Sequence, residues 1–139
     1  MDSKQLGNLG EKIAGNYLER KGYRILERNY SPRFISGPQK GEIDIVAKKK
    51  DIIIFVEVKT LRFVSPWPES SRRLSQDDSF NPEDKVDFLK QRKIIKTAES
   101  WLVKNKIFLE TKWQIDILAV GVDLNKRRAR IRHFKNAVA

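Results

Sequence analysis

The 139-residue chain carries 29 Lys and Arg against 18 Asp and Glu, a formal net charge of +11. Apolar residues make up 40% of it, enough for the core of an ordinary domain, so we expect one domain over residues 1–139. The lack of cysteine excludes disulfides, thiolate metal sites and a cysteine nucleophile. The basic excess indicates a polyanionic partner, with nucleic acid first, an anionic membrane surface second, and a basic surface without a ligand as the plain alternative.

No segment approaches the roughly 18 consecutive apolar residues that a membrane helix needs. Residues 2–5 are polar, and this opening segment lacks the apolar block of a signal peptide. A reducing cytosol also suits a chain without cysteine. We therefore expect a cytoplasmic protein that has no membrane partner.

The first half of the chain predicts a helix and three strands. Apolar residues at helical spacing predict a helix over 3–21, followed by a short strand over 23–29. Strict alternation predicts a strand over 42–48, with Ile43, Ile45 and Ala47 on one face. A turn over 49–51 leads into an apolar run over 52–60, which predicts a strand buried on both faces.

The second half predicts a loop, a helix and two strands. Proline, serine and scattered charges make 61–81 a long mobile loop. A helix is expected over 82–106 and strands over 113–122 and 127–134. The order of one helix, three strands, one helix and two strands favours an α/β fold, with helices packed on a mixed sheet of about five strands.

The apolar strand ends in charged residues. Glu57 and Lys59 share one of its faces, and the opposite face stays apolar throughout. Buried charges need each other, a metal or a solvent-filled cleft, because an unpaired buried charge is costly. If the turn pairs the two strands, Asp44 lies beside Glu57, and a cation between the two carboxylates would relieve their repulsion. Oxygen ligands without thiols favour Mg²⁺ or Mn²⁺ over zinc.

Such a trio suits phosphodiester hydrolysis. A metal on Asp44 and Glu57 would polarise a phosphoryl oxygen and lower the pKa of a bound water. Lys59 could orient the attacking water or offset charge that develops on the phosphate. The alternative is a surface salt bridge at a strand end, since an acid and a lysine two residues apart are a common pair.

Two segments carry a family resemblance. Residues 41–47, Gly-Glu-Ile-Asp-Ile-Val-Ala, followed by 55–60, Phe-Val-Glu-Val-Lys-Thr, resemble the bacterial YraN family of predicted endonucleases, which is related to archaeal Holliday-junction resolvases. Residues 10–18 and 131–137 extend the resemblance over nearly the whole chain. It implies a restriction-endonuclease-like fold and a metal-dependent PD-(D/E)xK endonuclease that hydrolyses DNA, with branched or junction DNA as the expected preference.

The resemblance also implies residue roles. Asp44 and Glu57 would be metal ligands together with the Val58 carbonyl, and Lys59 would be the catalytic lysine. Glu11 would match a first-helix acid that supports the metal site directly or through water. Its other interpretation is an exposed acid that the helix dipole favours.

Basic side chains on the second helix and the last strand suit contacts to DNA phosphates. The residues expected to bind nucleic acid are Lys90, Arg92, Lys93, Arg128 and Arg130. A non-catalytic nucleic-acid-binding module on the same fold is the competing function. A homodimer stays open, because resolvase relatives are dimeric.

Two further polar residues are weaker candidates for the site. His133 is the only histidine, and we expect it to serve structure or the surface rather than catalysis. Asp116 could reach the edge of the site, but an ordinary polar strand face explains it equally well.

Overall fold

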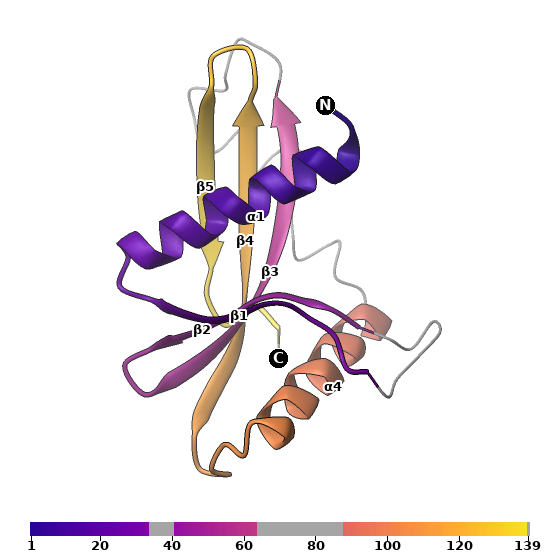
Figure 1. Ribbon diagram of the computed structural model, residues 1–139, viewed down its shortest axis with the longest axis vertical. Helices are drawn as coiled ribbons and strands as arrows, with labels where there is room; N and C mark the ends of the chain where they lie inside the picture. Colours follow the sequence, from indigo (N-terminus) through magenta and orange to yellow (C-terminus); the bar gives the residue numbers. More distant parts are fainter. Residues whose placement is uncertain (34–40, 64–87, 139) are drawn as a thin grey trace.

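The computed structural model describes residues 1–33, 41–63 and 88–138. The helices and strands follow the predicted order (Figure 1): α1 (Ser3–Arg20), β1 (Arg24–Tyr30), β2 (Ile43–Lys49), β3 (Ile52–Phe63), α4 (Phe88–Lys104), β4 (Lys112–Asp123) and β5 (Arg128–Phe134). None of the helices in the described part of the chain is long and apolar enough to cross a membrane.

The five strands form one mixed sheet in the order β1-β2-β3-β4-β5. Strands β3 and β4 are parallel and the other neighbouring pairs are antiparallel. A parallel pair needs a crossover connection, and α4 lies in that connection. In Figure 1, α1 crosses in front of β3, β4 and β5, and α4 lies beside the lower part of the sheet. This is the predicted α/β architecture, and it is consistent with a restriction-endonuclease-like fold.

Helix α1 begins with a capping box, in which Asp2 accepts from the backbone N–H of Gln5 and the Gln5 side chain accepts from that of Asp2. It ends before Gly22, whose φ of 92° suits glycine. Its buried face carries Ala14 and Leu18 into an apolar cluster on one side of the sheet. The strand residues of that cluster are Ile45, Ala47, Ile54, Val56, Leu118, Val120 and Val122.

The other side of the sheet packs against α4. Ile94, Ala98 and Trp101 join a second apolar cluster, in which the Trp101 ring meets Phe55 edge-on with centroids 5.7 Å apart. Phe55 and Val56 are neighbours on β3 that face opposite sides, and both are fully buried. The prediction of a strand buried on both faces is therefore confirmed.

The structure corrects two details of the predicted strands. Ile43 packs in the α4-side cluster whereas Ile45 and Ala47 pack in the α1-side cluster, so the expected common face of the three residues was wrong. The regular alternation of β2 breaks at Asp44, which lies between the two clusters. Strand β3 also continues to Phe63, because β4 provides partners up to Asp123. The first three residues of the expected loop 61–81 are thus strand.

The rest of that predicted loop lies outside the described residues, as does the predicted start of the second helix at 82–87. The described part of that helix runs from Phe88 to Lys104, two residues short of the expected end at residue 106.

Gly10 allows α1 to approach β3 closely. A Cβ at this position would meet the side chain of Thr60, whereas a Cβ at Gly7 on the same helix would have no atom within 4 Å. We expect Gly10→Ala to lower the free energy of unfolding by about 1–3 kcal/mol through overpacking. Gly7→Ala, the matched control, should raise it by up to about 1 kcal/mol through helix propensity. Urea denaturation of both variants tests this, and equal midpoints would contradict it.

Candidate functional site

The predicted trio lies where β2 and β3 separate. Their pairing ends at Ile45 and Val56, whereas the pairing of β3 with β4 continues to Phe63. The register places Asp44 across from Glu57 just beyond the last pair. Asp44 Oδ2 accepts a hydrogen bond of 2.8 Å from the backbone N–H of Val58. A carboxylate of β2 therefore bonds the β3 backbone where strand pairing has ended.

Glu57 and Lys59 point to the same side of β3, as their spacing predicts. Lys59 Nζ lies 3.4 Å from Glu57 Oε1, with side chains 27% and 14% exposed respectively. Both groups are thus partly accessible and paired with each other. The structure brings Asp44, Glu57 and Lys59 together, while their chemical roles stay predictions.

Acidic side chains accumulate around Asp44. The pKa of Asp44 is raised to about 8: burial is the largest cause, Glu57, Glu11 and Glu42 also raise it, and the hydrogen bond from the Val58 N–H lowers it. The pKa of Glu11 is raised by burial and then by Glu42 and Glu57, and Arg28 lowers it. The first helix, the residue before β2, and strands β2 and β3 thus contribute carboxylates that repel one another. A cation at this position would offset that repulsion.

The donor set suits a hard divalent ion. Mg²⁺ is usually held by one or two carboxylates together with waters and substrate phosphate oxygens. Asp44 and Glu57 could supply the carboxylates, and the Val58 carbonyl is the third predicted ligand. Within the described ranges, no group of three or more Asp, Glu or His side chains is arranged to hold a metal ion. The remaining positions would therefore fall to water and substrate.

The raised pKa of Asp44 predicts a pH-dependent stability of the metal-free protein. Its folded pKa of about 8 lies above the ordinary value of 3.8, so the folded state keeps a proton that the unfolded chain loses. This contribution is fully present below pH 3.8 and is lost as pH rises through about 8. In chelator, the free energy of unfolding of wild type should fall more steeply with rising pH than that of Asp44→Asn. Parallel curves from urea titrations at several pH values would refute this.

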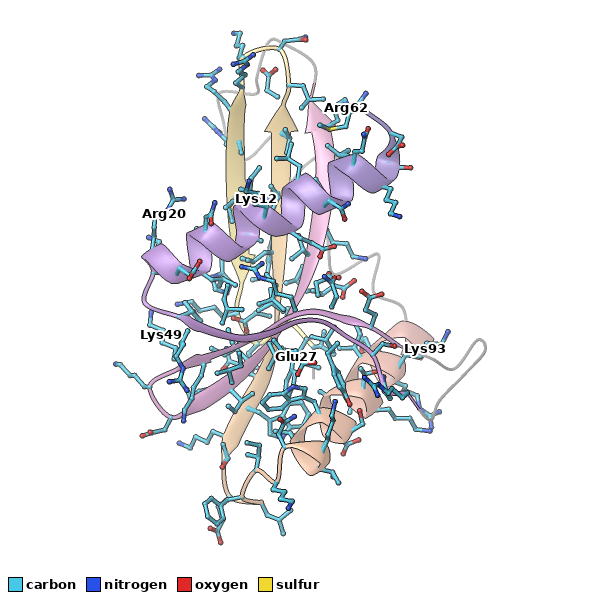
Figure 2. The ribbon with its side chains drawn as sticks, viewed as in Figure 1. Lys12, Arg20, Glu27, Lys49, Arg62 and Lys93 are labelled. Carbon is cyan, nitrogen blue, oxygen red and sulfur yellow. The ribbon has the colours of Figure 1, made fainter. Side chains whose placement is uncertain are left out.

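The predicted DNA-binding residues lie on two elements. Arg92 and Lys93 are exposed on α4, and the side chain of Lys90 lies outside the described residues. The backbone of Lys93, which is labelled in Figure 2, lies close to Gly41, the residue before Glu42. A Cβ on Gly41 would be 3.1 Å from the carbonyl oxygen of Lys93. Arg128 is exposed and Arg130 partly exposed on β5.

Strand register links β5 to the trio. Lys59 pairs with Ala119, which pairs with Arg132, and Leu61 is connected to Arg130 in the same way through Gly121. Directly paired residues project to the same face of a sheet. Arg130 and Arg132 are therefore on the face that carries Glu57 and Lys59. Arg132 belongs to the basic residues of the last strand, and the strand register aligns it with Lys59.

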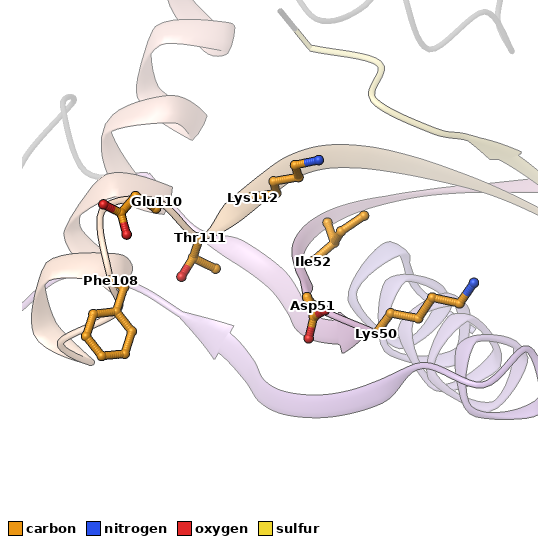
Figure 3. Close-up of a pocket in the computed structure, with 7 residues that line it drawn as sticks. All are labelled: Lys50, Asp51, Ile52, Phe108, Glu110, Thr111 and Lys112. Atoms are coloured by element: carbon orange, nitrogen blue, oxygen red, sulfur yellow. The ribbon is translucent and has the colours of Figure 1, made fainter.

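A shallow hollow lies at the other end of the β2–β3 hairpin (Figure 3). Its lining is Lys50, Asp51, Ile52, Phe108, Glu110, Thr111 and Lys112. None of the predicted site residues is among them, and its charges are mixed. The hollow is therefore separate from the acidic site.

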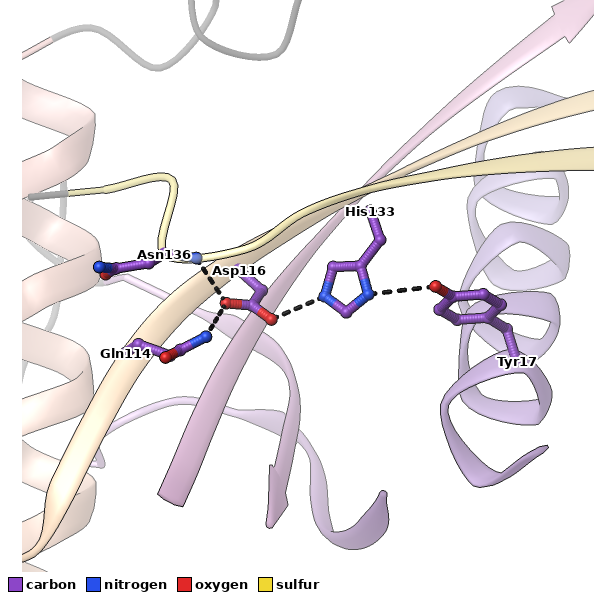
Figure 4. Close-up of polar contacts among 5 residues, drawn as sticks. All are labelled: Tyr17, Gln114, Asp116, His133 and Asn136. Atoms are coloured by element: carbon purple, nitrogen blue, oxygen red, sulfur yellow. Dashed lines mark hydrogen bonds and ion pairs between the residues drawn. The ribbon is translucent and has the colours of Figure 1, made fainter. Parts of the chain in front are cut away.

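Asp116 and His133 form a buried network on the α1 side of the sheet (Figure 4). His133 Nε2 lies 2.7 Å from Asp116 Oδ2, and its Nδ1 lies 3.2 Å from the Tyr17 hydroxyl. Asp116 Oδ1 accepts from Gln114 Nε2 and from the backbone N–H of Asn136, each at 2.8 Å. The network joins α1, β4, β5 and the residues after β5, on the face opposite Lys59. This placement supports a structural role for His133 and places Asp116 away from the edge of the site.

Hydrogen bonding controls the ionisation of Asp116. Burial raises its pKa, but the hydrogen bonds from His133, Asn136 and Gln114 together outweigh burial, so the net pKa is lowered. The carboxylate is therefore charged at neutral pH. A lone acid within the apolar run 115–120 was the sequence signal of a buried partner.

Comparison with known proteins places the chain in a family. Residues 10–120 match the profile of UPF0102, an uncharacterised protein family. The chain belongs to the UPF0102 family. A UPF0102 protein of Alkaliphilus oremlandii (strain OhILAs) is 36% identical over 135 residues, covering 97% of this chain and 98% of the relative. A UPF0102 protein of Caldanaerobacter subterraneus subsp. tengcongensis is 36% identical over 138 residues, covering 99% and 97%.

Among solved structures, this UPF0102 chain is similar to Pyrococcus furiosus SfsA in complex with Ca²⁺. The TM-score is 0.34 and the identity 20%, over 96% of this chain and 64% of SfsA. A TM-score this low does not establish a shared fold.

Proposed function

We propose that this UPF0102 protein is a divalent-metal-dependent endonuclease that hydrolyses DNA phosphodiester bonds. The observation that carries the proposal is the convergence of Asp44, Glu57 and Lys59 where β2 and β3 separate. Carboxylates that repel one another beside a lysine suit a site for a cation and a phosphate. The resemblance of residues 41–47 and 55–60 to the YraN family supports the nuclease assignment.

The site residues would have different roles in the proposed reaction. Asp44, Glu57 and the Val58 carbonyl would hold Mg²⁺ or Mn²⁺, which when bound supplies Lewis acidity and an acidified water. The hydrogen bond from the Val58 N–H fixes one oxygen of Asp44 and leaves the other to bind. Lys59 would orient the attacking water or stabilise charge on the phosphate. Its contact with Glu57 holds it on the face where the phosphate would lie.

Charge and register support DNA as the substrate. The chain has a net charge of +11, and Arg130 and Arg132 share the sheet face of Lys59. Contacts to backbone phosphates position a duplex without reading its sequence, which suits recognition of DNA shape. We infer branched or junction DNA as the preferred form, a cytoplasmic location, and a homodimer as the arrangement that provides two sites per junction.

A cleavage assay tests the proposal. Labelled junction, flap and linear DNA are incubated with wild type and with Asp44→Asn, each in Mg²⁺, Mn²⁺ or chelator. We expect metal-dependent cleavage by wild type and none by the variant, whose neutral amide can still accept from the Val58 N–H. If wild type never cuts more than Asp44→Asn, the nuclease proposal fails. Salt-sensitive binding without cleavage would then indicate a nucleic-acid-binding module.

A further inference from the structure

Asn29 occupies a special backbone position beside the acidic site. Arg28 pairs with Ile45 and Tyr30 with Ile43, so the register sets Asn29 across from Asp44. Its φ is 52°, in the left-handed region that asparagine tolerates better than most side chains. The backbone of β1 thus departs from extended geometry at the residue opposite the expected metal ligand.

The carboxamide of Asn29 bridges two acids. With its nitrogen toward them, it donates to Glu11 Oε1 at 2.9 Å and to Glu42 Oε1 at 3.3 Å. The opposite orientation would place its oxygen against two carboxylate oxygens, which is unfavourable. One neutral side chain therefore connects an acid of α1 with the acid that precedes β2.

The neutrality of this bridge suits a cation site. Glu11 and Glu42 repel each other, and each has three rotatable bonds that would let it turn to solvent. A carboxamide holds both with hydrogen bonds and adds no positive charge that would compete with a metal. The nearby cation Arg28 lies over the helix instead, where a Cβ on Gly15 would be 2.6 Å from its guanidinium.

We propose that Asn29 is a positioning residue, which holds the Glu11 carboxylate beside Asp44 and Glu57 so that it can support the bound cation. This inference rests on the proposed function. It assigns Glu11 to the site rather than to a dipole-stabilised helix surface. It also gives a function to the asparagine at this left-handed position of β1.

Two variants distinguish the effect of the Asn29 carboxamide from the effect of the backbone conformation at this position. Asn29→Gly keeps the positive φ and removes the bridge. Asn29→Asp keeps the shape and the tolerance of positive φ but replaces the donor with a third carboxylate. Asn136→Gly is the matched control, because Asn136 has a φ of 51° and lies outside the site.

The main measurement is the Kd for Mn²⁺ of the metal-free protein without DNA, by isothermal titration calorimetry. We expect Asn29→Gly and Asn29→Asp to weaken Mn²⁺ binding by about 10-fold or more, the usual size of outer-shell effects, and to lower kcat. DNA affinity in chelator should stay within about two-fold of wild type for Asn29→Gly, since the carboxamide touches acids and not the basic face. Asn136→Gly should leave the Mn²⁺ affinity unchanged.

The outcomes are distinguishable. If wild type binds Mn²⁺ and cleaves while both Asn29 variants match it, the positioning role is overturned and the proposed function stands. If Asn29→Asp binds Mn²⁺ more tightly than wild type, position 29 faces the cation as a ligand, which also overturns the positioning role. If wild type neither binds Mn²⁺ nor cleaves, the proposed function fails and the role of Asn29 fails with it.

Discussion

Lys59→Ala is expected to lower kcat for DNA cleavage by roughly 100-fold or more, the loss typical of removing one donor that stabilises a transition state. Lys59 Nζ lies 3.4 Å from Glu57 and on the face shared with Arg130 and Arg132, so it is placed to meet a phosphate held by the site. The KM should change far less than kcat, because the other residues proposed to contact the DNA backbone are unchanged. Steady-state kinetics in Mg²⁺ measure both constants.

The matched control for this variant is Lys112→Ala. Lys112 is an exposed lysine at the start of β4, paired with Ile52 beside the turn of the β2–β3 hairpin, so its loss removes one positive charge without touching the site. It should lower kcat by less than about two-fold and weaken binding only as much as one lost phosphate contact would. If both variants lose the same activity, or if Lys59→Ala raises KM with kcat intact, Lys59 serves only in DNA binding.

Asp116→Ala is expected to lower the free energy of unfolding by about 3 kcal/mol or more, because each buried donor left without its acceptor costs about 1–3 kcal/mol. The side chain of Asp116 is fully buried, and its removal leaves His133 Nε2 and the Asn136 N–H without their acceptor. A loss of this size is a large share of the 5–15 kcal/mol that a typical domain has in total. Denaturant unfolding followed by circular dichroism measures it.

Tyr17→Phe provides the comparison for the same network. It removes one hydroxyl that contacts His133 Nδ1 at 3.2 Å, so it should cost only about 1 kcal/mol. The net lowered pKa of Asp116 adds a pH test: its contribution is present at neutral pH and is lost as pH falls through that lowered pKa. An Asp116→Ala variant as stable as Tyr17→Phe would show that the network contributes little to folding.

Much of the fold follows from local patterns. In the run Ile52–Thr60, every residue before Glu57 is apolar, so both faces of the strand are apolar there. This pattern specifies a strand covered on two faces. The helical spacing of apolar residues between Leu6 and Leu18 specifies the face that α1 buries. These predictions held because side-chain periodicity and burial are properties of a short segment. The end of β3 was missed, since Leu61–Phe63 is strand only because β4 extends beside it.

The spacing of Glu57 and Lys59 is enough to put them on one face of β3, because residues two apart on a strand point the same way. A short turn also brings Asp44 near them. The separation of β2 from β3 at this point, which turns Asp44 toward the Val58 N–H, depends instead on packing between elements. The alternation within residues 42–48 could not reveal this, because the break at Asp44 depends on two different packing partners.

The long-range polar contacts also depend on packing between elements. Tyr17 and His133 are 116 residues apart in the chain, and Asn29 meets Glu11 across the gap between β1 and α1. Hydrogen bonds between such distant residues depend on how the helix packs over the sheet, which no local pattern encodes. Local patterns therefore indicate which residues could carry the chemistry, and packing between distant segments brings some of them together.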